Sequence, residues 1–193
     1  VANKVQDGTN KLGLTYETAA ETIENFELVD TPANATGNFT DAPITVTYVY
    51  KRKNAGKVTA THKDESGTTL SPNVEQDGTK KLGTAYTTEA ATIANFELTA
   101  TPANANGTFT TADQTVDYVY RRKNAGNVTV EYKDEEGNAL VANKVQDGTN
   151  KLGLPYTTDE EVIENFELVE TPANAAGNFT DAPITVTYVY KRK

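Results

Sequence analysis

Three residue types are absent from this chain of 193 residues: cysteine, methionine and tryptophan. Without cysteine the chain forms no disulfide, no thiolate metal site and no thiol nucleophile. Histidine is nearly absent as well, because His62 is the only one. Chemistry that depends on a thiol or an imidazole therefore has almost no residues to use, and we expect neither an enzyme nor a bound cofactor.

Positive charge is scarce relative to negative charge. The chain carries 18 basic and 27 acidic residues, which gives a formal charge of −9 and a pI near 4.7. This balance argues against nucleic acid and against anionic membrane surfaces as partners. No run of eighteen apolar residues occurs, so we expect no membrane insertion. The opening VANKV lacks the pattern of a secretory leader, so a secreted protein would be represented here by a fragment.

The sequence repeats itself with a period of 70 residues. The stretch VANKVQDGTNKLGL at 1–14 recurs letter for letter at 141–154, and a looser copy, SPNVEQDGTKKLGT, occupies 71–84. This period is too long for one turn of a solenoid, and it suits a small domain that folds alone and has been duplicated.

The Asn-Ala-Gly stretches at 54–56 and 124–126 mark the borders of the repeats. Counted from them, we expect complete repeats at 54–123 and 124–193. Residues 1–53 are then a third repeat that lacks its first strand, corresponding to the first seventeen positions.

The last repeat shows three predicted strands and a turn. Apolar and polar residues alternate over 127–134, as in a half-buried strand, and 139–146 form a second, less regular strand. Between them, 134–138 has the composition of a turn in which Gly137 adopts a positive φ. Residues 184–192, ITVTYVYKR, are the strongest strand of the repeat.

The segment 154–166 is the one predicted helix. Thr158 or Asp159 would cap it, and its acidic first turn suits the helix dipole. An apolar stripe would run along it through Val162, Ile163 and Phe166. FELVETP, at 166–172, then reads as another short strand, which Pro172 ends.

One face of the final strand is expected to be packed. Val186, Tyr188 and Tyr190 share that face, whereas the opposite face carries Thr187, which the middle repeat replaces by Asp117. The tyrosine face is therefore the buried one. Four strands and one short helix per repeat indicate an α+β fold in which the helix covers one face of the sheet.

Several strings of the last repeat together resemble the MucBP (mucin-binding protein) repeat of Gram-positive cell-surface adhesins. They are Gly153 to Thr158 (GLPYTT), Phe166 to Leu168 (FEL), Pro172 to Thr180 (PANAAGNFT), Thr185 to Lys191 (TVTYVYK) and the opening VTVEYKDEEGN at 128–138. The match extends over essentially every repeat, with Asn165-Phe166 standing where the family usually has Gly-Tyr.

The resemblance implies tandem ubiquitin-like β-grasp domains, each a mixed sheet with one short helix. It further implies a secreted, extracellular location with the parent protein anchored to the cell wall, adhesion to host mucin or glycoprotein glycans, and no enzymatic activity. In a β-grasp fold the strand that 1–53 lacks lies in mid-sheet, so we expect this repeat to be distorted or propped by strand contact with another chain. In an alternative phase, 57–64 would instead fold back on 45–51 and complete the first unit.

Two motifs have plain structural explanations. His62 occupies a position where the next repeat has Tyr132, so it is expected to fill a tyrosine-sized place in a strand. The oxygen-rich stretch 134–138 offers ligands to Ca²⁺ or forms a simple hairpin turn. It lacks the full calcium-loop spacing, so we expect no metal site.

A candidate glycan site lies in the loop 102–113. It consists of the amide, hydroxyl and carboxylate side chains of Asn104, Asn106, Thr108 and Asp113. Such groups hydrogen-bond sugar hydroxyls, but they equally satisfy the backbone of their own loop.

Two functions fit the near-identical repeats. The repeats bind mucin or glycoprotein glycans weakly and gain strength through multivalency, or they form a structural stalk that projects a distal adhesive domain from the cell wall. The basic stretches YKRK and YRRK at the repeat ends are interpreted as solvated flanks of the linkers, with contact to a wall polymer as the alternative.

Overall fold

A computed structural model describes residues 1–193, and it contains sixteen strands and no helix. The expected α+β, ubiquitin-like β-grasp unit with one short helix is therefore wrong, and the repeats are all-β. Because the chain has no helix, it has none that could cross a membrane. The strands are β1 (Thr15–Glu17), β2 (Phe26–Leu28), β3 (Thr36–Asn38), β4 (Tyr50–Arg52), β5 (Val58–Asp64), β6 (Thr69–Gln76), β7 (Ala85–Thr87), β8 (Phe96–Leu98), β9 (Asn106–Thr108), β10 (Gln114–Arg122), β11 (Val128–Asp134), β12 (Lys144–Gln146), β13 (Pro155–Thr157), β14 (Phe166–Glu170), β15 (Ala176–Asn178) and β16 (Ile184–Arg192).

Internal contacts divide the chain into two compact units, and each is described by itself. The first comprises Val1–Thr59, Val74–Thr88 and Asn104–Val116. The second comprises Ala60–Asn73, Glu89–Ala103 and Asp117–Lys193, so the last repeat lies wholly within it.

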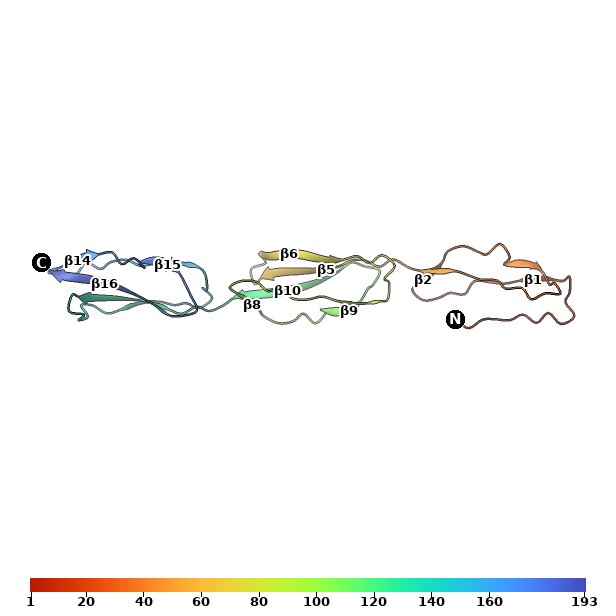
Figure 1. Ribbon diagram of the computed structural model, residues 1–193, viewed down its shortest axis with the longest axis horizontal. Coiled ribbons are helices and arrows are strands. Elements are labelled where there is room, and N and C mark those ends of the chain that lie inside the picture. The colour runs from red at the N-terminus through yellow and green to blue at the C-terminus, as the bar shows by residue number, and fades with distance from the viewer. The chain divides into compact units, whose positions relative to one another are not determined.

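The last repeat is built on a four-stranded sheet in the order β12-β11-β16-β14. Figure 1 labels two of its strands, β14 and β16. The two central strands are parallel, with Val128 opposite Ile184 and Asp134 opposite Tyr190. Both edge strands pair antiparallel with their neighbours. A separate two-stranded sheet, β13-β15, comes from the connection between β12 and β16.

The packed face of this sheet is the tyrosine face, as the alternation predicts. Val186, Tyr188 and Tyr190 are buried together with Val130 and Tyr132 of β11. The rings of Tyr132 and Tyr188 stack with centroids 5.7 Å apart. Aromatic pairs in this arrangement stabilise a core beyond the area that they bury.

The segment predicted as a helix is extended or irregular, and a tyrosine hydroxyl explains why. Between β13 and β14, the Tyr190 hydroxyl accepts a hydrogen bond from the Glu161 N–H and donates one to the Glu161 carbonyl, each at 2.9 Å. The Thr158 hydroxyl does not cap a helix but donates to the Ala175 carbonyl at 3.0 Å. Val162, predicted in the apolar stripe, is 99% exposed, while Ile163 packs against the core. Backbone groups that a helix would pair internally are thus satisfied by side chains of the sheet.

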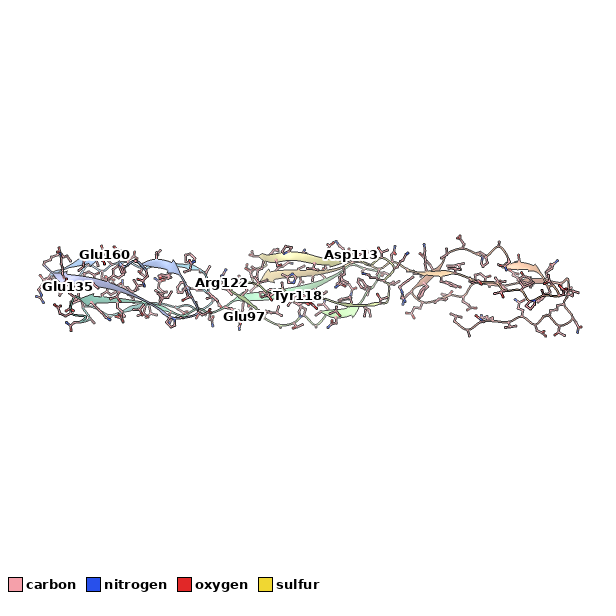
Figure 2. All side chains as sticks on the ribbon, in the orientation of Figure 1. Glu97, Asp113, Tyr118, Arg122, Glu135 and Glu160 are labelled. Carbon is pink, nitrogen blue, oxygen red and sulfur yellow. The ribbon has the colours of Figure 1, made fainter.

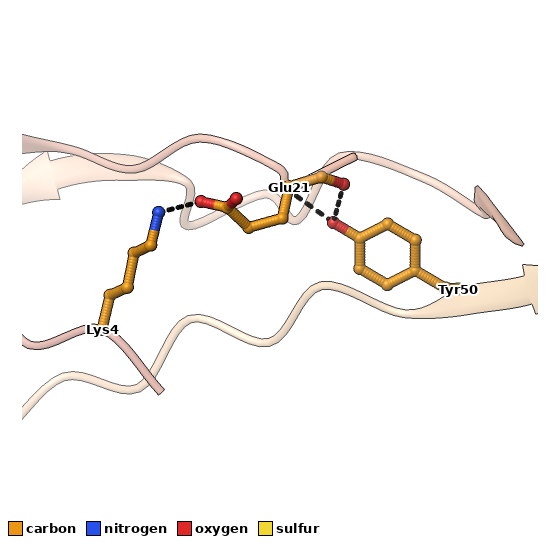
Figure 3. A network of polar contacts seen from close by, with 3 residues as sticks. All are labelled: Lys4, Glu21 and Tyr50. Atoms are coloured by element: carbon orange, nitrogen blue, oxygen red, sulfur yellow. Dashed lines mark hydrogen bonds and ion pairs between the residues drawn. The ribbon is translucent and has the colours of Figure 1, made fainter. Parts of the chain in front are cut away.

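The first repeat uses the same device. The Tyr50 hydroxyl bonds both the N–H and the carbonyl of Glu21 at 2.8 Å, and Lys4 forms an ion pair with the Glu21 carboxylate (Figure 3). These residues hold the positions of Tyr190, Glu161 and Lys144 in the last repeat, where Lys144 also pairs with Glu161.

The first repeat is less ordered at its final strand. It has only the pairs β1-β3 and β2-β4, and residues 43–49 belong to no strand. Val46 and Tyr48 are half-buried here, whereas the corresponding Val186 and Tyr188 are buried. The core of this repeat is therefore open on the side where the last repeat has β11.

In the middle repeat the strand order is β6-β5-β10-β8, equivalent to that of the last repeat. β4 pairs only with β2, so the alternative pairing of 57–64 with 45–51 does not form. His62 lies on β5, is 2% exposed and stacks on Tyr118 at 5.4 Å with the rings 8° from parallel. It fills the place that Tyr132 fills in the last repeat.

The turns follow the chemistry that their residues predict. Gly67 and Gly137 have φ angles of 90° and 86° in the hairpins after β5 and β11. The Asp134 carboxylate accepts hydrogen bonds from the backbone N–H groups of Glu136 and Asn138. A residue with a Cβ is strained at such φ angles, which accounts for glycine in both copies.

Candidate functional site

Two of the four predicted glycan-binding residues form hydrogen bonds with backbone groups of the chain itself. The Asn104 amide donates to the Thr115 carbonyl at 2.9 Å, and the Asp113 carboxylate accepts from the Lys57 N–H at 2.9 Å (Figure 2 labels Asp113). The amide bond recurs in the other repeats, from Asn34 to Thr45 and from Asn174 to Thr185. The asparagine at this position therefore has the same structural role in each repeat, because its amide ties the loop to the segment that follows.

The other two predicted residues lie side by side on an exposed strand. Asn106 and Thr108 occupy alternate positions of β9, so both point to the same face, and both are exposed. Neither side chain makes a hydrogen bond within the chain, which leaves their polar groups free. The corresponding residues differ between repeats, since Asn106 aligns with Thr36 and Ala176.

One recess in the structure is lined by residues of the last repeat. It has a volume of about 420 Å³ and is lined by Val130, Tyr132, Lys144, Val145, Gln146 and Asp159. The middle repeat has Val74 and Glu75 in place of Lys144 and Val145, so the chemistry of this recess is not shared. A binding function common to the repeats therefore cannot rest on it.

The titratable groups of the turns are engaged in local hydrogen bonds. The Asn138 side chain and the backbone N–H groups of its turn hold the pKa of Asp134 below its ordinary value. The Ser66 hydroxyl has the largest such effect on the pKa of Asp64. No group of three or more His, Cys, Asp or Glu side chains comes together as metal ligands would. The Asp134 turn is thus a closed hairpin.

The connection between successive repeats uses the same contacts at both junctions. The first connector is defined as residues 52–56, and it packs on the loop 78–83 of the repeat that follows. The Arg52 guanidinium lies over the Phe26 ring, 4.5 Å from its centroid, and donates to the Leu82 carbonyl at 2.8 Å. One side chain therefore contacts the repeat it belongs to and the next one.

Asparagines reinforce this contact on both sides. The Asn54 side chain accepts from the Lys80 N–H at 3.0 Å. The Asn25 side chain fits so closely against Gly83 that a Cβ built there would lie 2.4 Å from its Nδ2 atom. Gly83 also has a φ of 75°, so both its conformation and its surroundings call for glycine.

The backbone of the connector is hydrogen-bonded to loops of the middle repeat rather than solvated. The Ala55 N–H donates to the Gly78 carbonyl and the Gly56 N–H to the Thr110 carbonyl, both at 2.9 Å. The Leu82 N–H donates to the Lys53 carbonyl at 3.2 Å. A Cβ at Gly56 would lie 2.3 Å from the backbone of Ala112, which explains the glycine of the Asn-Ala-Gly sequence.

The second connector, residues 122–126, reproduces these contacts against the loop 148–153. Arg122, labelled in Figure 2, lies 4.5 Å from the Phe96 centroid and donates to the Leu152 carbonyl at 2.8 Å. Asn124 accepts from the Asn150 N–H at 3.0 Å. A Cβ at Gly153 would lie 2.4 Å from the Nδ2 atom of Asn95, the same distance as at the first connector.

The interpretation of the basic repeat ends as solvated flanks is therefore wrong for Arg52 and Arg122. Both side chains are partly buried between a phenylalanine and a backbone carbonyl of the next repeat. The sequence did carry a signal, because arginine recurs at 52, 122 and 192 while its neighbour is Lys51, Arg121 or Lys191. Arg121 instead pairs with Glu97 inside its own repeat, at 2.6 Å.

Comparison with protein families finds three tandem matches to the model described as the MucBP domain. They cover residues 1–51, 57–121 and 127–191, which is nearly the whole chain.

Among known proteins, the chain is similar to internalin J of Listeria monocytogenes, with 40% identity over 182 residues. That alignment covers 92% of this chain but only 21% of internalin J, so the chain spans about a fifth of its relative. Two solved structures also resemble it. One is described as streptococcal high identity repeats in tandem (SHIRT) domains 3-4 from a cell surface protein, at 16% identity and a TM-score of 0.34, covering 72% of this chain and 98% of that structure. The other is a type 2 repeat of the mucus binding protein MUB from Lactobacillus reuteri, at 18% identity and a TM-score of 0.26, covering 72% of this chain and 100% of that structure.

Proposed function

Because the chain belongs to the MucBP domain family, we propose that it is a non-catalytic tandem-repeat segment of a surface adhesin whose repeats act as a stalk. The stalk would hold a distal adhesive domain away from the cell wall. The observation that carries this proposal is the pair of connectors, which dock each repeat on the next through the same set of contacts.

The energetics of a connector favour a preferred orientation over free rotation. Each arginine contributes a hydrogen bond from a charged donor, of about 1.5–3 kcal/mol. The cation–π contact adds roughly 0.5–1 kcal/mol at a partly exposed site. Backbone hydrogen bonds and the close glycine contacts then limit the bending that a short polar linker would otherwise allow.

Distance measurements across the second connector test this proposal. Spin labels are attached in the full chain at Ala100→Cys and Val162→Cys, both exposed positions in a protein without native cysteine. We expect a narrow distance distribution that broadens in the Arg122→Ala variant. Arg121→Ala is the matched control, because Arg121 is adjacent but pairs only with Glu97. A broad distribution in the unmodified connector, or equal broadening by both variants, would contradict the stalk.

Glycan binding is the second candidate function. Asn106 and Thr108 support it, because they present uncommitted polar groups on one exposed face. A solved protein resembling this chain is named as mucus binding, which points to mucin or host glycoprotein glycans as the ligand class. Weak sites of this kind would gain strength through multivalency.

Surface plasmon resonance over immobilised mucin tests this second candidate. We expect binding that glycosidase treatment of the mucin abolishes and that the double variant Asn106→Ala/Thr108→Ala weakens. Thr111→Ala is the control, since Thr111 is exposed in the same repeat but lies outside β9. Binding that is absent from the unmodified chain, or insensitive to glycosidase, would leave the stalk as the function.

The repeat limits and the cellular location complete the proposal. We take the repeats to be 1–53, 54–123 and 124–193, and the parent protein to be extracellular and anchored to the cell wall, as family membership supports. Residues 43–49 of the first repeat, which lack strand partners, are proposed to accept a strand from another chain. Sedimentation of the chain measures this: a monomer at all concentrations, with rapid amide exchange over 43–49, would exclude such a contact.

A further inference from the structure

The first and last strands of the last repeat are neighbours that run in the same direction. β11 and β16 are paired in parallel over seven residues, from Val128 opposite Ile184 to Asp134 opposite Tyr190. The Ile184 N–H also donates to the Asn127 carbonyl at 2.9 Å, just ahead of this ladder. The two strands that join the repeat to its surroundings are therefore bonded directly to each other.

This arrangement fixes how a pulling force reaches the ladder. The second connector leads into β11 at Val128, and the chain leaves β16 at Arg192. Because the strands are parallel, these two points lie at opposite ends of the paired segment. Tension along the chain therefore slides β11 against β16 and loads all of the ladder hydrogen bonds together.

The packing of the two strands shields this ladder from water. Val128, Val130 and Tyr132 of β11 are each no more than 2% exposed. Their partners Val186 and Tyr188 on β16 are equally buried, and Ile184 is half-buried. On the other face, the Thr187 hydroxyl donates to the Glu131 carboxylate across the strands at 3.4 Å. Sliding by one residue would turn buried tyrosines toward solvent, because side chains alternate between the faces.

We propose that the last repeat resists tension along the chain because β11 and β16 form a shear clamp. The inference deepens the stalk function and rests on it for its purpose, since a stalk transmits the force exerted on a bound cell. The middle repeat has the same strand order and is assigned the same role. The first repeat has no strand beside 43–49 and is expected to yield at low force.

The same sheet offers an internal contrast. β14 runs antiparallel to β16, with Phe166 opposite Arg192. A force applied at residues 164 and 193 acts on adjacent ends of that pair and opens it one residue pair at a time. Zipper opening of this kind loads few hydrogen bonds at once and needs a smaller force than shear.

Single-molecule force spectroscopy on the full chain with two sets of handles tests the clamp. Lys123→Cys with Lys193→Cys applies tension in shear, and Glu164→Cys with Lys193→Cys applies it to the zipper; all three side chains are exposed. We expect the rupture force to be several times higher in the shear geometry. Rupture there should release about 70 residues, or roughly 240 Å of chain at ~3.4 Å per residue. Equal forces in the two geometries would overturn the proposal.

A reversible cross-link gives a second test. Glu131→Cys and Thr187→Cys place two thiols where the native side chains already meet, and the chain has no other cysteine. The chain is then pulled through terminal tags. After oxidation, verified by mass spectrometry, the extension released by the last repeat should shrink to the residues outside the cross-link, and reduction should restore it. Because the cross-link carries the load past the ladder, the rupture force of the last repeat should also change on oxidation. Rupture at the same force in the oxidised and reduced forms would show that the ladder between β11 and β16 does not resist the pull.

The two proposals can fail separately. Free rotation at the second connector would contradict the stalk but leave the shear force of the last repeat unchanged. A low shear force would contradict the clamp. Narrow distances across the connector would still support docking of one repeat on the next, so the stalk would stand.

Discussion

Replacing His62 by tyrosine should stabilise the middle repeat. The imidazole is buried, its Nδ1 atom has no hydrogen-bond partner, and its Nε2 atom lies 3.4 Å from the Glu89 carbonyl. In the last repeat, the Tyr132 hydroxyl donates to the equivalent Asp159 carbonyl at 3.2 Å. The two copies of this site thus offer the same backbone acceptor to a different ring.

The magnitude follows from what the substitution changes. An unsatisfied polar atom in a buried place costs about 1–3 kcal/mol, and a new hydrogen bond contributes about 1 kcal/mol. Some of this gain is offset by repacking around the larger ring, which costs up to a similar amount where space is tight. We expect the free energy of unfolding of the middle repeat to rise by about 1–2 kcal/mol for His62→Tyr.

Native-state hydrogen exchange, resolved by peptide, measures the stability of each repeat within the full chain. Peptides from β5 should show slower exchange in His62→Tyr, while those from β11 stay unchanged. The reciprocal substitution Tyr132→His should lower the stability of the last repeat by a comparable amount. If both substitutions destabilise their repeats, the two sites are not equivalent and the reasoning fails.

Three further predictions concern the connector, the turn and the segment that is not a helix. Gly153→Ala should broaden the spin-label distances across the second connector. Gly13 has the same φ of 79° but open space around it. Gly13→Ala should therefore lower the free energy of unfolding only by the backbone strain of about 1 kcal/mol, measured by thermal unfolding. Asp134→Asn should flatten the acid limb of the curve of stability against pH, measured by unfolding at a series of pH values. Hydrogen bonds lower the pKa of the folded carboxyl. Its contribution to stability is therefore complete above the ordinary aspartate pKa and is lost as the pH falls through the lower folded value. Val162→Ala should change the free energy of unfolding by less than ~0.5 kcal/mol and Ile163→Ala should reduce it by roughly 1–2 kcal/mol; equal effects would indicate that both side chains share one buried face, as in a helix.

The sequence alone determined the features that depend on neighbouring residues. The alternation in 127–134 and 184–192 predicts two strands with a buried tyrosine face, and the structure confirms both. Glycine after Asp134 predicts a tight turn with positive φ, which Gly137 adopts. These signals are local, because strand periodicity and turn geometry are set within a few residues.

The tertiary structure alone decided the features that depend on distant partners. The stretch 154–166 has the cap and acidic turn of a helix, yet the Tyr190 hydroxyl from another strand holds the backbone of Glu161 in a different conformation. Among the predicted glycan residues, Asn104 is committed to a carbonyl eleven positions away, which no local pattern reveals.

The connectors show the same limit most clearly. Arg122 looks like one more basic residue in a charged repeat end, and its role comes from Phe96 before it and from Leu152 in the following repeat. The repeat length of 70 residues is visible in the sequence, but the docking of one repeat on the next is not. That docking exists only when two folded repeats bring a ring and a carbonyl to the same guanidinium, so the sequence specifies the repeats and the tertiary structure specifies how they are joined.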